Sequence, residues 1–176
     1  MPRVSWKPGL RLCLAVVVSS ALMRDARAAE PLPNNARADS VVVLKKERKL
    51  ILYSQGQVLK TYSISLGAEP IGPKTQQGDH RTPEGHYILD RRNPNSRFYR
   101  SIHISYPKPE QIEAARKAGV PPGGDVFIHG LPNGFGWLGS AQRRYDWTDG
   151  CIAVTNVEMD EIWRAVPDGT SIEIKP

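Results

Sequence analysis

Residues 125–156 read DVFIHGLPNGFGWLGSAQRRYDWTDGCIAVTN, and this stretch decides how the rest of the chain is interpreted. The apolar triplet before His129 predicts a short buried strand that ends at this histidine. A long loop rich in glycine and polar residues follows, and Cys151 then enters a second apolar strand. Because a histidine ends one strand and a cysteine begins the next, we expect the two side chains to meet.

A cysteine beside an imidazole has the chemistry of a nucleophile. The reactive form is the thiolate, and a nearby imidazole either takes the thiol proton or stabilises the anion as an ion pair. Gly150 lets the backbone approach a ligand closely, and the Cys151 amide could donate to a developing oxyanion. Two alternatives stay open: a buried, inert thiol for Cys151 and a hydrogen-bonded structural residue for His129.

Outward from this stretch, the chain from Ser40 onward shows mainly strand patterns. Short apolar or alternating segments are separated by turn residues, as in a meander of hairpins. The expected strands are Val41–Leu44, Leu50–Tyr53, Val58–Leu66, His86–Leu89, Ser101–Ser105, Val126–Ile128, Cys151–Val154 and Ser171–Ile174.

Two short helices interrupt the strands. Pro109–Ala118 has proline in its first turn and stops before Gly119. The second helix begins at Thr155, where Glu158 has the spacing of a capping box. An apolar face with helical spacing follows, formed by Met159, Ile162, Trp163 and Val166. These patterns predict a mainly β domain, a β-sandwich with two short helices.

The first 28 residues have the pattern of a secretory signal peptide. A basic start precedes the apolar run of residues 12–23, and Ala26-Arg27-Ala28 supplies the small residues of a cleavage site. This run has 12 residues, whereas a membrane span needs about 20, so we expect no stable span. An uncleaved amphipathic anchor is the alternative. The expected location is the periplasm or cell envelope.

The expected mature chain comprises a short linker, residues 29–39, and one domain, residues 40–176. Removing residues 1–28 takes away five cations and one anion, which lowers the formal net charge from +6 to +2. The high charge therefore belongs to the targeting segment and gives no support for nucleic-acid binding. Cys151 is the one cysteine left, so an exported chain would have no internal disulfide.

Several motifs occur in a familiar order. His129-Gly130 is followed by a loop and then by Thr148-Asp149-Gly150-Cys151. Upstream, residues 78–85 (GDHRTPEG) contain a Thr-Pro-x-Gly segment, and residues 101–107 and Pro122-Gly123-Gly124 extend the match. Together they resemble the L,D-transpeptidase catalytic domain, the YkuD-like family, over about residues 40–176.

This resemblance implies a β-sandwich catalytic domain that acts on peptidoglycan in cell-wall biogenesis and cell shape. Such enzymes attack the bond between meso-diaminopimelate and D-Ala in a stem peptide, form a thioester on the cysteine and pass the acyl group to an amine. By position, Cys151 is the nucleophile, His129 the base, the Gly130 carbonyl orients the imidazole, and Gly150 and Cys151 form part of the oxyanion hole. No metal or organic cofactor is expected, whereas stem peptides, an envelope lipoprotein or free D-amino acids are expected partners.

The sequence departs from the family pattern in two places. The loop between His129 and Thr148 has 18 residues, slightly longer than in the family, and a loop insertion costs little entropy. The family's second histidine is replaced by Asp149. Asp149 either supports His129 or binds a cationic amine of the substrate, and its presence leaves transfer and hydrolysis both open.

Other residues near the cysteine are candidates for substrate binding. Arg143 and Arg144 suit the carboxylates of stem peptides, although a solvated charged loop explains them equally well. Thr148 and Trp147 directly precede the nucleophile turn, and Trp147 alternatively packs under it. His80 lies in a polar loop and is assigned no role. A zinc site has little support because no tight ligand pair is present.

Three functions therefore compete. The first is a transpeptidase acting on peptidoglycan, and the second is a hydrolase of the same site that trims stems or releases a bound lipoprotein. The third, from another class, is a non-catalytic peptidoglycan-binding module. The joint presence of His129, Gly150 and Cys151 argues against the third.

Overall fold

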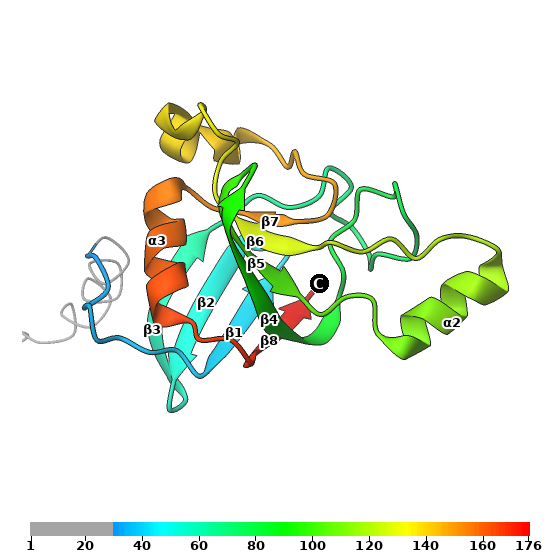
Figure 1. Cartoon of the computed structure of the whole chain (residues 1–176), viewed down its shortest axis with the longest axis horizontal. Helices are drawn as coiled ribbons and strands as arrows, with labels where there is room; N and C mark the ends of the chain where they lie inside the picture. Colours follow the sequence, from blue (N-terminus) through cyan, green and yellow to red (C-terminus); the bar gives the residue numbers. More distant parts are fainter. Residues whose placement is uncertain (1–29) are drawn as a thin grey trace, which may run out of the picture. The chain divides into compact units, whose positions relative to one another are not determined.

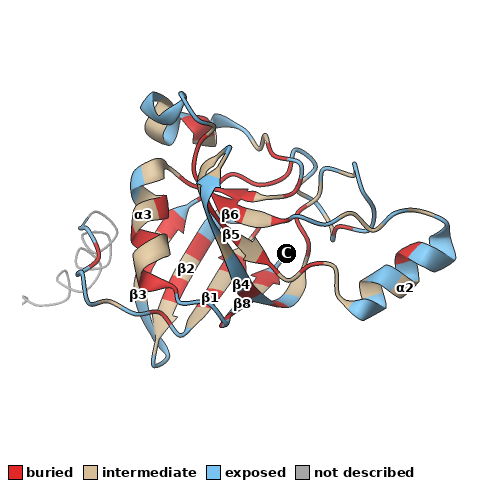
Figure 2. Ribbon diagram, in the orientation of Figure 1, coloured by how far each residue is buried: buried red, intermediate tan, exposed pale blue. Residues whose placement is uncertain are grey.

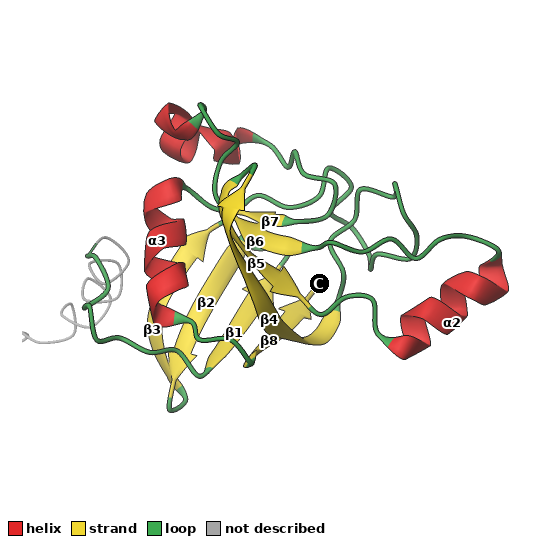
Figure 3. Ribbon diagram, viewed as in Figure 1, coloured by secondary structure: helices red, strands yellow, loops and turns green. Residues whose placement is uncertain are grey.

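A computed structural model describes residues 30–176. The predicted signal segment, residues 1–28, and the first residue of the predicted linker lie outside the described residues. Within the described part, the chain forms mainly strands (Figures 1 and 3). The strands are β1 (Ser40–Leu44), β2 (Lys49–Ser54), β3 (Gln57–Ser63), β4 (Gly85–Ser96), β5 (Tyr99–Ile104), β6 (Phe127–His129), β7 (Ile152–Ala153) and β8 (Thr170–Lys175).

All eight strands belong to one sheet, in the order β3-β2-β1-β8-β4-β5-β6-β7. The pairs β1/β8 and β6/β7 are parallel, and the other neighbours are antiparallel. Two isolated bridges, Ser65 with Ala153 and Gly67 with Thr148, join the chain after β3 to the opposite edge of the sheet. The sheet therefore curls until its two edges meet, which confirms the predicted mainly β class.

The core lies inside this curl, and its pattern follows from strand alternation. Val41 and Val43 on β1 lie in register with Ile172 and Ile174 on β8, and all four are buried. Side chains two residues apart point to the same face of a strand, so the alternating apolar positions form one continuous layer (Figure 2).

Both predicted helices are present, as α2 (Pro109–Ala118) and α3 (Asn156–Ala165). α3 starts with the predicted capping box, in which Thr155 and Glu158 satisfy each other's backbone amides. Its face of Met159, Ile162 and Val166 is fully buried, whereas α2 buries only Ala115 (Figure 2). α3 therefore belongs to the core, and α2 is largely exposed.

A third helical segment lies where the sequence predicted only a loop. This is η1, a 3-10 helix over Gly136–Arg144 with a kink at Gly139, whose φ is 47°. Successive 3-10 turns need no apolar face of regular period, so a glycine-rich stretch without periodicity gave no sign of them. In the described residues no helix is long and apolar enough to cross a membrane.

The segment before β1, predicted as a linker, has no regular structure but packs against α3. Leu32 and Ala38 are buried, and the Ala38 amide donates to the Ala165 carbonyl at 2.8 Å. The buried Glu161 carboxylate accepts from the Leu32 amide and from the Lys60 ammonium. Residues 32–38 therefore contribute to the core.

Candidate active site

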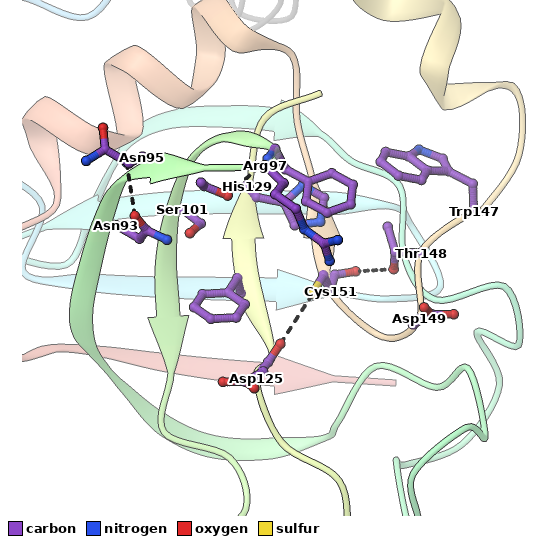
Figure 4. Close-up of a pocket in the computed structure, with 13 residues that line it drawn as sticks. Asn93, Asn95, Arg97, Ser101, Asp125, His129, Trp147, Thr148, Asp149 and Cys151 are labelled. Atoms are coloured by element: carbon purple, nitrogen blue, oxygen red, sulfur yellow. Dashed lines mark hydrogen bonds between the residues drawn. The ribbon is translucent and has the colours of Figure 1, made fainter. Parts of the chain in front are cut away.

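The two strands that carry His129 and Cys151 are neighbours. β6 and β7 run parallel, with His129 opposite Ala153 and Ile128 opposite Ile152. Cys151 directly precedes β7, so its backbone lies level with Phe127, two positions before the histidine. Residues two positions apart share a face of a sheet, which places the cysteine and the histidine on a diagonal of one face. Both side chains line a single cleft of about 540 Å³ (Figure 4).

His129 is buried, with 3% of its surface exposed. Its Nδ1 lies 2.6 Å from the Gly130 carbonyl oxygen. A carbonyl only accepts hydrogen bonds, so Nδ1 carries the proton and donates, and Nε2 of the neutral ring keeps its lone pair. Burial lowers the pKa of His129 to about 4, although the Gly130 carbonyl opposes this shift. The ring is therefore neutral at neutral pH.

Two aromatic side chains produce this burial. The ring of Phe98 lies 4.6 Å from the His129 ring, and the Trp147 ring lies 5.8 Å from it in an edge-on contact. Phe98 stands at the turn between β4 and β5, more than 30 residues from the histidine in sequence. Trp147 Nε1 donates to Gln142 Oε1 at 2.8 Å. Trp147 thus packs beside the imidazole while also lining the cleft.

Cys151 is half-buried and is the free cysteine of the described chain. Its Sγ lies 3.7 Å from the Asp125 carbonyl oxygen, as a weak thiol donor (Figure 4). Burial raises the pKa of this thiol to about 11, the Asp149 and Asp125 carboxylates raise it further, and the Phe127 amide and Lys74 lower it. The resting sulfur is therefore a thiol, and its hydrogen bond goes to Asp125 and not to His129.

The turn that delivers Cys151 is held by Thr148. The buried Thr148 hydroxyl donates to the Cys151 carbonyl at 2.7 Å and accepts from the Gly150 amide at 3.2 Å. The Thr148 hydroxyl is engaged inside the turn, although Thr148 also lines the cleft, and the Gly150 amide is bonded to this hydroxyl.

Gly150 has a backbone conformation and a close neighbour that both favour glycine at this position. Its φ is 123°, in the region that favours glycine. A Cβ at this position would lie 2.5 Å from the Arg81 carbonyl oxygen. Gly150 therefore permits a close approach between the nucleophile turn and the chain's own loop around Arg81.

Asp149 does not support His129, so that hypothesis is wrong. Its carboxylate lies 2.8 Å from Nδ1 of His80, and 91% of its side chain is exposed. The positive φ at Gly150 turns the chain between Asp149 and Cys151 out of a regular strand, which separates the two side chains. Asp149 nevertheless lines the cleft, where its carboxylate faces solvent.

The two arginines predicted to bind substrate lie away from this cleft. η1 directs Arg143 and Arg144 into a separate hollow that also contains Lys46 and Arg48. Arg143 forms an ion pair with Glu158 at the start of α3. Proximity in sequence to Cys151 therefore did not bring either arginine to the cleft.

Several cleft residues were not singled out by the sequence analysis, because they come from a distant segment or, like Asp125, belong to no motif. The β4–β5 turn supplies Arg97 and Phe98, and the segment before β6 supplies Asp125. His80 reaches the site only through its contact with Asp149, 69 residues away, although a histidine within GDHRTPEG was a detectable signal. Among residues 30–176, no group of three His, Cys, Asp or Glu side chains is placed to hold a metal ion.

The fold and the site together describe a curled β domain that holds a cysteine and a buried, neutral histidine at the ends of adjacent strands. Comparisons with known proteins identify the class more closely. The model of the YkuD family, the L,D-transpeptidase catalytic domain, matches residues 38–174. The chain therefore belongs to the L,D-transpeptidase catalytic domain family.

Individual relatives agree with this assignment. YafK of Escherichia coli (strain K12) is 34% identical over 133 residues, which is 72% of this chain and 46% of YafK. The chain thus spans about half the length of the curated relatives it matches.

Solved structures confirm the expected fold. The K307A mutant of the helical cell shape determining protein Pgp2 from Campylobacter jejuni has a TM-score of 0.59 at 24% identity, covering 88% of this chain and 52% of Pgp2. An L,D-transpeptidase from Xylanimonas cellulosilytica has a TM-score of 0.52 at 17% identity, covering 83% of this chain and 64% of that one.

Proposed function

We propose that the chain is a cysteine-dependent acyl-transfer enzyme that acts on peptidoglycan stem peptides, at the bond between meso-diaminopimelate and D-Ala. One observation carries the proposal: a buried neutral imidazole, fixed at Nδ1 by the Gly130 carbonyl, lines the same cleft as Cys151. The fixed tautomer leaves Nε2 as the proton acceptor, which is what a general base requires.

The resting groups are both neutral, so the thiolate forms during attack and is not stored as an ion pair. The Cys151 side chain first rotates from the Asp125 carbonyl towards His129, a change between staggered rotamers. As Sγ bonds to the stem carbonyl carbon, its proton passes to Nε2 of His129. Catalytic hydrogen bonds often tighten only in the substrate complex. In this proposal, the hydrogen bond from Cys151 Sγ to His129 Nε2 forms in that complex.

Collapse of the tetrahedral intermediate completes the first half of the reaction. The C–N bond to D-Ala breaks, the imidazolium returns the proton to the leaving amine, and the thioester stays on Cys151. An acceptor amine then attacks the thioester, gives its proton to His129, and restores the thiol. The Cys151 amide is the donor available to the oxyanion, because the Gly150 amide is bonded to Thr148.

Charged groups around the cleft suit a stem peptide, which carries both carboxylates and amines. Arg97 lines the cleft and is exposed, so it can pair with a substrate carboxylate. Asp149 and Asp125 expose 91% and 87% of their side chains, and they can accept a cationic amine. Trp147 contributes an apolar part of the cleft wall. Asp149 thus keeps one of its two hypothesised roles.

The wider biological assignment follows from the same proposal. An enzyme of stem peptides works outside the cytoplasmic membrane, in agreement with the signal pattern of residues 1–28. Its acceptor is another stem peptide, an envelope lipoprotein or a free D-amino acid. The Thr-Asp-Gly-Cys variant of the family motif belongs to this proposal as the feature that sets the balance between transfer and hydrolysis.

Product analysis on purified tetrapeptide muropeptides tests the proposal. We expect release of D-Ala together with cross-linked dimers, detected by mass spectrometry, and no products with Cys151→Ala. Release of D-Ala with tripeptides alone would identify a hydrolase of the same site. Binding to muropeptides without any product from the wild type would instead identify a non-catalytic module.

A further inference from the structure

The loop of residues 74–82 lies directly against the turn that carries the nucleophile. A Cβ on Gly150 would lie 2.5 Å from the Arg81 carbonyl oxygen and 3.8 Å from Nζ of Lys74. A Cβ on Gly67 would similarly lie 2.1 Å from the His80 carbonyl oxygen. The loop is thus packed backbone to backbone beneath the turn, and the ammonium group of Lys74 faces the residue next to Cys151.

Lys74 is held in this position by a buried ion pair. Only 6% of Lys74 is exposed, and its Nζ donates to Asp79 Oδ1 at 2.7 Å and to the Gln76 carbonyl at 3.1 Å. The Asp79 carboxylate also accepts from the backbone amides of Thr75, Gln76 and Arg81. Burial alone would raise the pKa of Asp79, but these hydrogen bonds outweigh it and lower the pKa to about 2.

The ion pair of Lys74 with Asp79 places a fixed cation next to the nucleophile turn. Four donors fix the Asp79 carboxylate at one end, and the ammonium of Lys74 extends from it towards Gly150. Pairing with Asp79 compensates the burial of the Lys74 ammonium, and the pair keeps this cation facing Gly150. A fixed cation favours any negative charge that develops nearby, and it needs no reorganisation at the moment of reaction.

We propose that Lys74 is a positioning residue for the nucleophile, because its buried ammonium lies behind the Gly150–Cys151 turn and favours negative charge on the Cys151 sulfur. The inference rests on the proposed function, in which Cys151 is the nucleophile. It explains how a thiol in a buried setting, flanked by the carboxylates of Asp125 and Asp149, becomes reactive.

The charges around the thiol agree with this role. Burial is the largest influence on the pKa of Cys151 and raises it, and the carboxylates of Asp149 and Asp125 act in the same direction. Lys74 is the side-chain cation that acts in the opposite direction. Removing its charge should therefore leave a smaller fraction of thiolate at any pH below the pKa of the thiol.

A second buried lysine supplies a matched control. Lys45 is 2% exposed, and its Nζ binds the Gly72 carbonyl, the Thr82 carbonyl and the Glu84 carboxylate at 2.6, 2.9 and 2.7 Å. It therefore ties down the same stretch of chain as Lys74. Lys45 is not among the charges that act on Cys151. A variant at Lys45 loosens the loop but leaves the field at the sulfur unchanged.

The test measures how fast Cys151 reacts with iodoacetamide between about pH 7 and pH 9, followed by intact mass of the purified full chain. All proteins carry Cys13→Ser, so that Cys151 is the one thiol of the chain. We expect Lys74→Met to react roughly threefold to tenfold more slowly at each pH, because one pKa unit changes the thiolate fraction tenfold. Lys74→Arg and Lys45→Met should react within about twofold of the wild type.

Asp79→Asn separates the charge effect from a loss of loop stability, because the two effects predict opposite changes in rate. This variant removes the counter-charge of Lys74, so it should react faster than the wild type, opposite in sign to Lys74→Met. Equal rates for Lys74→Met and wild type would overturn the proposal, as would a common slowing of the Lys74, Lys45 and Asp79 variants. If Lys74→Met fails to fold, the acceleration or slowing in Asp79→Asn decides the matter.

Iodoacetamide needs only the thiol, so this result is separable from the proposed function. If the protein shows the expected alkylation pattern but leaves muropeptides unprocessed, the acyl-transfer assignment alone is contradicted. If Lys74→Met processes muropeptides at the wild-type rate and its alkylation is also unchanged, the role of Lys74 alone is contradicted.

Discussion

The two sides of the cleft differ sharply in their exposure to water. His129 is 3% exposed, lies against Phe98 and Trp147, and has its pKa lowered to about 4 by burial. Asp149, on the other side, exposes 91% of its side chain and pairs with His80. The buried side fixes a protonation state, whereas the exposed side presents charge that water and salt screen. Substitutions on the buried side should therefore have the larger effects.

The largest effect is expected from His129→Gln, which keeps a polar side chain but removes the base. Acylation of Cys151 should slow by roughly a hundredfold to ten-thousandfold, the usual contribution of a positioned general base. The measurement is the rate of adduct formation with a carbapenem, followed by mass spectrometry. A loss below about tenfold would show that the imidazole does not take the thiol proton.

The buried histidine should also make stability depend on pH. The folded-state pKa of His129 is about 4, below the ordinary value of 6.5, so the unfolded chain binds a proton that the folded chain excludes between these values. This contribution to stability is present above about pH 6.5 and is lost as the pH falls towards 4.

Denaturant unfolding at about pH 7 and pH 4.5 measures this loss, with His129→Gln as the reference. The wild type should lose roughly 2 kcal/mol more than the variant over this interval. Equal losses in the two proteins would mean that His129 titrates normally and is more exposed than its contacts with Phe98 and Trp147 imply.

A smaller effect is expected from uncovering the imidazole. Phe98→Ala removes one aromatic wall, so the pKa of His129 should rise towards 6.5 and more of the ring should be protonated in mild acid. At about pH 5.5 acylation should fall by up to about tenfold, with little change near pH 8. Phe98→Leu, which keeps most of the volume, should follow the wild type. A loss that is uniform across pH would indicate damage to the cleft and not a shifted pKa.

The smallest effect is expected on the exposed side, from Asp149→His. This change restores the family pattern and removes a carboxylate that pairs with His80. If Asp149 favours hydrolysis, the ratio of cross-linked to trimmed muropeptide should rise, by about threefold or less because the site is screened. Asp125→Asn, which removes the other exposed carboxylate, serves as the control. An unchanged ratio in Asp149→His would end the idea that this residue decides between amine and water.

Local sequence patterns correctly predicted the features that depend on neighbouring residues, such as helix bounds, helix caps and strand ends. α2 has its predicted bounds, α3 has its predicted capping box, and β6 ends at His129 as expected. Proline at a helix start, a threonine three residues before a glutamate and a run of apolar residues each act within one or two turns of chain. The pairing of β6 with β7, which brings His129 and Cys151 to one cleft, was not itself predicted.

The rest of the site depends on contacts that no local pattern contains. β4 continues seven residues beyond its predicted end at Leu89, through the polar stretch of residues 90–96, and its turn brings Phe98 over His129. A polar strand without alternation is set by its partner β5 and not by its own composition. In the same way, the pairing of Asp149 with His80 and the position of Lys74 depend on a loop folded under the nucleophile turn.

The intact mass of the protein after incubation with a carbapenem tests the central claim most directly, because a strained β-lactam carbonyl mimics the acyl donor. The account predicts one covalent adduct on the wild type and none on Cys151→Ala. A wild type that stays unmodified, or a Cys151→Ala variant that still carries the adduct, would contradict the assignment of this sulfur as the nucleophile.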